Sequence, residues 1–133
     1  MADSVFTKII KGEVPSYKVY EDESTYAFMD IRPLNPGHVL VITKQETDHI
    51  WDLDLELYQH LMETTKKVAL RIQQVLRPPR VGMNVEGFGV PHVHVHVYPL
   101  YKGLESTMAE YIAKADQQAP DEELAEMAKK LAF

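Results

Sequence analysis

Residues 92–96 read His-Val-His-Val-His, and this alternation constrains the fold more than any other part of the chain. Valine is β-branched and favours extended backbone, so the run is predicted to be a strand. Side chains of a strand alternate between its two faces, which puts His92, His94 and His96 on one face. A sheet face with three neighbouring imidazoles indicates a catalytic or metal site rather than a core.

The composition indicates a globular protein that is acidic overall. The 133 residues suit a single domain with a substantial core, so we expect one domain over residues 1–133. The net charge of −6 argues against a nucleic-acid binder, but a locally positive pocket can still take a nucleotide. The chain has no cysteine, which excludes disulfides and thiolate metal sites and favours a cytoplasmic protein. No segment approaches membrane-spanning length, so no membrane association is expected.

Apolar periodicity predicts five strands and one long helix. The strands are expected at residues 17–20, 26–29, 38–43, 81–86 and 92–97. The long helix is expected over residues 52–76, where Leu61, Val68 and Ile72 recur at helical spacing before Pro78 and Pro79. Short helices are expected at residues 6–10, from about residue 105 and from about residue 121. This arrangement predicts an α+β fold with a mainly antiparallel sheet.

Three interpretations of the histidine run remain open. The histidines are fortuitous polar positions of a half-buried strand, or they bind a metal ion, or one of them is a nucleophile. A stiff strand separates His92 and His96 by roughly 13 Å, which is too far for one zinc ion to bind all three easily. A nucleophilic imidazole needs an acceptor on its other nitrogen and a neighbouring proton donor, and phosphorus chemistry suits such a set best.

The run from His92 to Val97 resembles the signature of the histidine triad (HIT) family, in which histidines alternate with apolar residues. Residues 6–15, Phe-Thr-Lys-Ile-Ile-Lys-Gly-Glu-Val-Pro, are similar to the opening segment of that family, and residues 27–33 and 36–42 are similar to its central segment. The resemblance covers about residues 4–100 and leaves residues 101–133 as a helical extension. It implies a HIT-like fold, with a five-stranded mainly antiparallel sheet, one long helix and C-terminal helices.

The family is known for hydrolysing or transferring nucleotides at the α-phosphate. The resemblance implies that His94 attacks this phosphorus and forms a covalent nucleotidyl-histidine, which water or another acceptor resolves. It implies that the backbone carbonyl of His92 fixes the tautomer of His94, while the His92 side chain joins a proton network with His38. His96 is expected to contact the phosphate and the scissile oxygen.

Further positions match nucleotide-binding residues of the family. The resemblance implies that Asn84 helps to hold phosphate and that Asp30 binds the ribose hydroxyls. From the residue pattern alone, Asp30 would be a turn residue, because an acid at a strand end most often is. The expected base pocket consists of Val5, Phe6, Ile9, Val14, Phe28 and Ile31. The implied partners are a purine nucleotide, presented as a phosphoramidate or a dinucleoside polyphosphate, and a second copy of the chain; a divalent cation can accompany a polyphosphate.

The chain departs from the family just before the triad. Many relatives carry Gly-Gln-Ser/Thr-Val there, with a polar pair that contacts phosphate or the leaving group. Residues 87–90 instead read Gly-Phe-Gly-Val, so backbone N–H groups around Gly89 are the donors that remain for a phosphate. This departure favours the alternative to an enzyme, a nucleotide-binding regulatory protein with little turnover.

Two further departures concern metal binding and the C-terminal region. Many bacterial relatives bind structural zinc through Cys-x-x-Cys and two histidines. Ser4 and Thr7 occupy the cysteine positions here, which leaves His49 and His92, and two histidines make a poor closed zinc site. We therefore predict no metal site. The C-terminal helices have their own sequence and are expected to pack or to cap a dimer rather than to catalyse.

Overall fold

The sheet of this α+β protein has five antiparallel strands in the order β1-β2-β3-β5-β4. The computed structural model describes residues 2–114 and 116–133. The strands are β1 (Lys18–Glu21), β2 (Thr25–Met29), β3 (Val39–Thr43), β4 (Arg80–Asn84) and β5 (His94–Leu100). The helices are α1 (Val5–Ile10), α2 (Leu55–Leu76), α3 (Leu104–Ile112), α4 (Asp121–Leu131) and the 3-10 helix η1 (Ile50–Asp52). The predicted fold class is confirmed.

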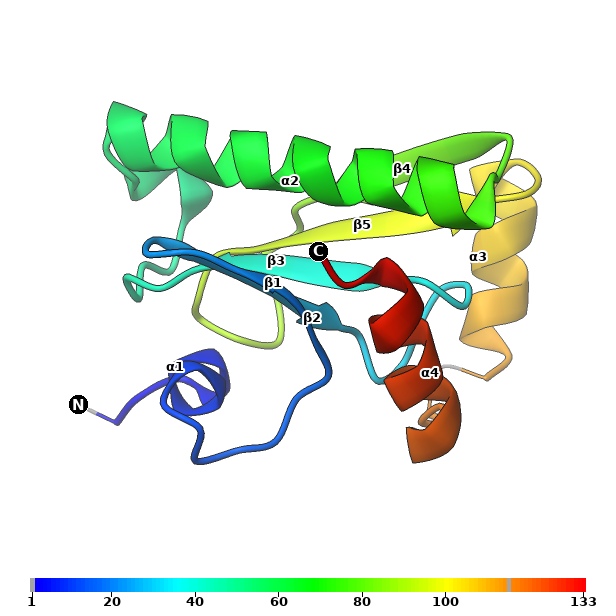
Figure 1. Ribbon diagram of the computed structural model, residues 1–133, viewed down its shortest axis with the longest axis horizontal. Coiled ribbons are helices and arrows are strands. Elements are labelled where there is room, and N and C mark those ends of the chain that lie inside the picture. Colours follow the sequence, from blue (N-terminus) through cyan, green and yellow to red (C-terminus); the bar gives the residue numbers. More distant parts are fainter. Residues whose placement is uncertain (1, 115) are drawn as a thin grey trace.

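The two faces of the sheet have different partners. Helix α2 runs along one face, and α1 lies on the opposite side (Figure 1). The main core lies between the sheet and α2, where Val41, Val95 and Leu61 are fully buried and α4 adds Leu124. A smaller cluster under α1 contains Phe6, Tyr26, Phe28, Leu40 and Ile42. Because side chains alternate along β3 and β5, the valines fill the core and the other face is left for the site.

Helix α2 begins later than the sequence predicted. Residues 50–52 form η1, and Asp54 then caps α2 by accepting the backbone N–H of Leu57 at 2.8 Å. A capping aspartate has extended backbone, which separates the two helices and explains why the predicted start at residue 52 was wrong.

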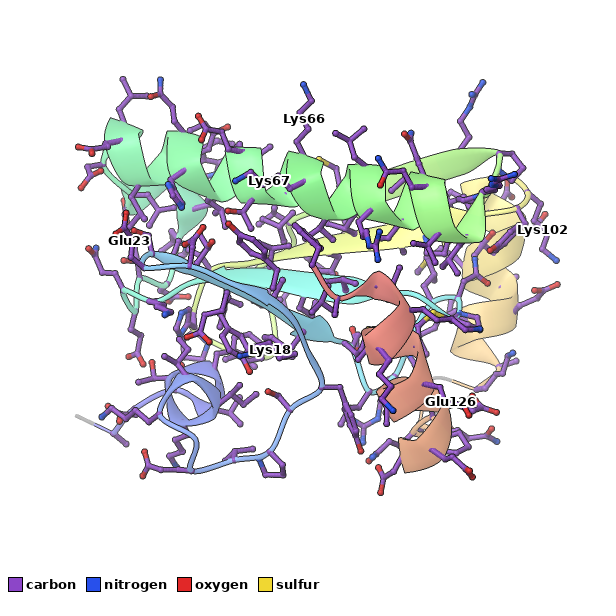
Figure 2. All side chains as sticks on the ribbon, viewed as in Figure 1. Lys18, Glu23, Lys66, Lys67, Lys102 and Glu126 are labelled. Atoms are coloured by element: carbon purple, nitrogen blue, oxygen red, sulfur yellow. The ribbon has the colours of Figure 1, made fainter. Side chains whose placement is uncertain are left out.

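On the outer face of α2 the side chain of Lys66 points away from the sheet (Figure 2). Within the described residues, no helix is long and apolar enough to cross a membrane.

Candidate active site

Strand β5 presents His94 and His96 on the sheet face that carries α1. His96 pairs directly with Leu40 of β3 and with Asn84 of β4, and directly paired residues share a face. The ring of Phe6 from α1 stands edge-on to His94, with 5.1 Å between the ring centroids. The sheet register therefore places His94 beneath α1 and puts Asn84 beside His96 on the same face.

A cavity of about 370 Å³ opens beside His94 and His96. Asp30 lines it, as do all six residues predicted for the base pocket, namely Val5, Phe6, Ile9, Val14, Phe28 and Ile31. Val90 also lines the cavity and was not among the residues predicted from sequence. The cavity lining does not include His38, His92, Asn84 or Gly89. The expected binding residues other than Asn84 and Gly89 thus surround one space, although they come from separate segments.

His92 does not belong to β5, contrary to the predicted strand of three histidines. The strand begins at His94, and the chain before it bends, with the N–H of His92 donating to the carbonyl of Val90 at 2.8 Å. The N–H groups of His92 and Val93 bond to Val90 and to Thr47 rather than to a neighbouring strand, which accounts for the late start. The His92 ring is completely buried, with Nε2 2.7 Å from the carbonyl oxygen of Thr43.

Ser4, Thr7, Glu46 and His92 form a hydrogen-bonded cluster. The Ser4 hydroxyl lies 2.7 Å from His92 Nδ1, and Glu46 accepts the Ser4 N–H and the Thr7 hydroxyl, each at 2.7 Å. These hydrogen bonds, led by that from the Ser4 backbone, lower the pKa of the Glu46 carboxyl. The sequence pointed to His49 as the second histidine here, but its side chain is 71% exposed beside Asp48. Glu46, which follows β3 closely, was not anticipated.

The backbone carbonyl of His92 holds the ring of His94. The distance from His94 Nδ1 to this oxygen is 2.7 Å. A carbonyl oxygen can only accept a hydrogen bond, so Nδ1 carries the proton and Nε2 keeps a lone pair. His94 lines the cavity, and its geometry agrees with the expectation that a carbonyl fixes a nucleophilic tautomer.

His38 pairs with His96 rather than with His92, which corrects the expected proton network. His38 Nε2 lies 3.0 Å from His96 Nδ1, while the His92 ring is held by other partners. Burial lowers the pKa of His38 to about 3 and that of His96 to about 4, and a neighbouring imidazole adds to each effect. Both rings are therefore neutral at pH 7.

Asp30 lies at the end of β2, next to this pair of histidines. One carboxylate oxygen accepts the backbone N–H of Arg32 at 2.8 Å, and the other lies 3.5 Å from His38 Nε2. Burial raises the pKa of the Asp30 carboxyl. Asp30, His38 and His96 form the one group of three within residues 2–114 and 116–133 whose ligand atoms are close enough to surround a metal ion.

Residues 87–90, just before the triad, carry no polar side chain. Gly87 and Gly89 both have a φ of 89°, in the left-handed region that favours glycine, and a Cβ atom at either position would meet nothing within 4 Å. Phe88 between them is 80% exposed. This loop is open, and its donors to a ligand are backbone N–H groups.

An antiparallel sheet with two histidines on β5 and a third in the preceding turn defines the histidine triad class. The profile of the HIT domain matches residues 11–103, and the chain belongs to this family. It is 37% identical over 109 residues to an uncharacterized HIT-like protein of Borreliella burgdorferi, covering 77% of this chain and 78% of that protein. It is 35% identical over 107 residues to an adenosine 5'-monophosphoramidase of Candida albicans, covering 74% and 70%.

Solved structures agree with this assignment. A crystal structure of a Hit-like protein involved in cell-cycle regulation from Bartonella henselae superimposes with a TM-score of 0.82 at 30% sequence identity. The match covers 98% of this chain and 97% of that chain, so it includes both C-terminal helices as well as the sheet.

Proposed function

We propose that this protein is a hydrolase or transferase that acts at the α-phosphate of a purine nucleoside phosphoramidate or a dinucleoside polyphosphate. The observation that carries the proposal is the 2.7 Å hydrogen bond between His94 Nδ1 and the His92 carbonyl. It leaves a nucleophilic nitrogen beside a cavity with apolar walls and the Asp30 carboxylate. Similarity to the adenosine 5'-monophosphoramidase of Candida albicans supports this substrate class.

The proposed reaction has two displacement steps. The lone pair of His94 Nε2 first forms a bond to the α-phosphorus, the bond to the leaving group breaks, and the leaving group keeps that electron pair and takes up a proton. Water then attacks the phosphorus and loses a proton, and the electron pair of the phosphorus–nitrogen bond returns to Nε2. Asp30 accepts hydrogen bonds from the ribose, and the side chain of Phe6 packs on the base.

Nucleotide release tests this proposal. The protein is incubated with an adenosine phosphoramidate and, separately, with a diadenosine polyphosphate, and AMP is measured. We expect kcat of His94→Ala to fall by at least about 10³-fold, because loss of a covalent nucleophile removes the main reaction path. His60→Ala is the matched control, since His60 lies on α2 and binds Asp22 at 2.9 Å, outside the cavity. Wild-type turnover that survives in His94→Ala would contradict the mechanism.

A nucleotide-binding regulatory protein is the second candidate, and the exposed Phe88 is the observation that favours it. The loop that carries Phe88 gives the leaving group no polar side chain. If this candidate is right, AMP binds in calorimetry, a substitution of Asp30 by Ala weakens binding, and neither substrate is hydrolysed.

We also propose that the protein is a homodimer. Strand β4 is an edge of the sheet, and an unpaired edge is a template for another strand. Large apolar side chains are exposed at this edge, namely Met83 and Val85, and Trp51 lines the same pocket as these two. An exposed apolar patch beside an open edge is typical of an interface between protein chains.

A further inference from the structure

We propose that the backbone N–H of Leu34 is a positioning group that holds His96 as a neutral hydrogen-bond donor toward the bound phosphate. This inference rests on the proposed function of His94 and adds the protonation state and the role of its neighbour. Leu34 lies in the loop between β2 and β3, the loop that begins with Asp30.

The backbone N–H of Leu34 can only donate a hydrogen bond, so it determines which nitrogen of its partner carries a proton. The N–H of Leu34 donates to His38 Nδ1 at 2.9 Å, so Nδ1 is an acceptor and carries no proton. A neutral His38 must then carry its proton on Nε2, which lies 3.0 Å from His96 Nδ1. His96 Nδ1 accepts that proton's hydrogen bond, and the proton of a neutral His96 is left on Nε2. One amide thus sets the tautomers of two rings.

The nitrogen that this chain of hydrogen bonds leaves on His96 faces the cavity. His96 lines the cavity, and no hydrogen bond to its Nε2 is formed by the described residues. Among those residues, every buried side-chain nitrogen or oxygen has a partner, so Nε2 is accessible. The rings of His94 and His96 are 5.2 Å apart between centroids. A phosphate attacked by His94 Nε2 therefore meets a fixed N–H donor on His96, which stabilises charge developing on its oxygens.

A second proton is disfavoured on the pair. Protonation of His96 at Nδ1 would turn two N–H groups toward each other, and protonation of His38 at Nδ1 would oppose the Leu34 N–H. The titratable groups that face the pair are Asp30 from the loop after β2, and His94 and Tyr98 from β5. The negative charge of Asp30 favours an added proton on His38 or His96, whereas the hydrogen bonds from Leu34 to His38 and from His38 to His96 disfavour it.

The same hydrogen bonds oppose a metal ion at Asp30, His38 and His96. An ion on His38 Nε2 would displace the proton to Nδ1, where the Leu34 N–H already points. The loop keeps this amide in place, because Asn35 Nδ2 donates to the carbonyl of Pro99 at 2.9 Å. The ligand geometry of the three residues is thus explained by a proton chain without an ion.

Nitrogen-15 NMR of the histidine side chains tests the inference in the wild-type protein at pH 7. We expect the proton of His94 on Nδ1 and those of His38 and His96 on Nε2, with the His38 and His96 rings neutral, and no change on adding zinc. A proton on His96 Nδ1, or a zinc-induced shift of His38, would overturn the inference. The measurement does not require turnover, so failure of this inference can be distinguished from failure of the proposed function.

A pair of variants at one position tests the role of the amide. Leu34→Pro removes the N–H, and Leu34→Ala keeps it. We expect the pKa of His38 in Leu34→Pro to rise by about one pH unit, since a hydrogen bond to Nδ1 is of that size, and kcat to fall about tenfold relative to Leu34→Ala. If the enzyme is active and the two variants have the same pKa of His38 and the same kcat, the positioning role of Leu34 is refuted, whereas the proposed function is not.

Variants of His38 keep the inference testable if Leu34→Pro does not fold. The side-chain amide of His38→Gln retains a donor for His96 Nδ1, whereas His38→Phe removes it. We expect His96 to keep its proton on Nε2 in His38→Gln and to have a higher pKa in His38→Phe than in His38→Gln, because a donor to Nδ1 favours the neutral ring. The same His96 tautomer and titration in both variants would contradict the proton chain.

Discussion

At the residue scale, the buried ring of His92 depends on the hydroxyl of Ser4. His92 Nε2 donates to the Thr43 carbonyl, so Nδ1 must accept from Ser4. Ser4→Ala leaves that nitrogen unpaired and removes the cap of α1, and we expect the free energy of unfolding to fall by about 2 kcal/mol. Thr7→Val is the matched control and is expected to cost less than about 1 kcal/mol, since the Thr7–Glu46 hydrogen bond is exposed. Urea unfolding measures both; equal losses would contradict the assigned hydrogen bonds.

The buried neutral histidines make stability depend on pH. Burial lowers the pKa of His38 to about 3, that of His96 to about 4, and that of His92 below its ordinary value of 6.5. Between pH 6.5 and the folded pKa the unfolded chain binds protons that the folded chain does not, so stability falls as pH falls through this window. Each histidine contributes up to about 1.4 kcal/mol per pH unit.

Urea unfolding at pH 7, 6 and 5 measures this slope. We expect the free energy of unfolding to decrease on acidification in the wild type and to decrease less steeply in His96→Asn, which lacks one of the three groups. The raised pKa of Asp30 increases the free energy of unfolding as pH falls. Because Asp30 is present in both proteins, the difference between their slopes reports on His96. The same slope in both proteins would show that His96 is not held neutral.

At the scale of the elements, the N-terminus of α2 gives a sharp test of the helix boundary. Asp54 accepts the N–H of Leu57 at 2.8 Å, so we expect Asp54→Ala to lower the free energy of unfolding by about 1 kcal/mol. Asp52→Ala is the control, because Asp52 belongs to η1 and does not cap α2. Thermal and urea unfolding compare the two variants, and a larger loss in Asp52→Ala would favour the boundary predicted from sequence.

The elements were predictable where one periodic pattern decided them. Leu61, Val68 and Ile72 recur at helical spacing and are buried in α2, and the valines of β5 fill the core. The start of α2 after Asp54 was not predicted, because other acidic residues precede Asp54 and nothing in their order shows which of them caps the helix. His92 was placed in a strand because the alternation continues through it, although its N–H donates to the carbonyl of Val90 instead of to a neighbouring strand.

The candidate site was predictable where its residues belong to sequence segments that resemble the family. His94, His96 and Asp30 were selected from motifs, and the structure gathers them around one cavity. Glu46 and the N–H of Leu34 were missed for physical reasons. A carboxylate after a strand is usually solvated, and a backbone amide is present at every residue except proline, so its direction depends on the fold alone.

At the scale of the whole molecule, we expect the proposed dimer to form through the edge strand β4 and its apolar neighbours. Trp51 is 81% exposed and Met83 is 47% exposed, so burying them against a second copy would remove a large apolar area from water. Pairing of two β4 edges would also satisfy backbone groups that one chain leaves open.

Size-exclusion chromatography with light scattering tests this expectation. We expect the wild type to have twice the mass of the chain, and Met83→Lys to weaken the dimer at least tenfold, because about 1.4 kcal/mol of lost burial corresponds to that factor in Kd. Ile112→Lys is the matched control: Ile112 is comparably apolar and exposed, but it lies on α3 rather than beside the β4 edge. A monomeric wild type, or dissociation by Ile112→Lys alone, would show that β4 is not the interface.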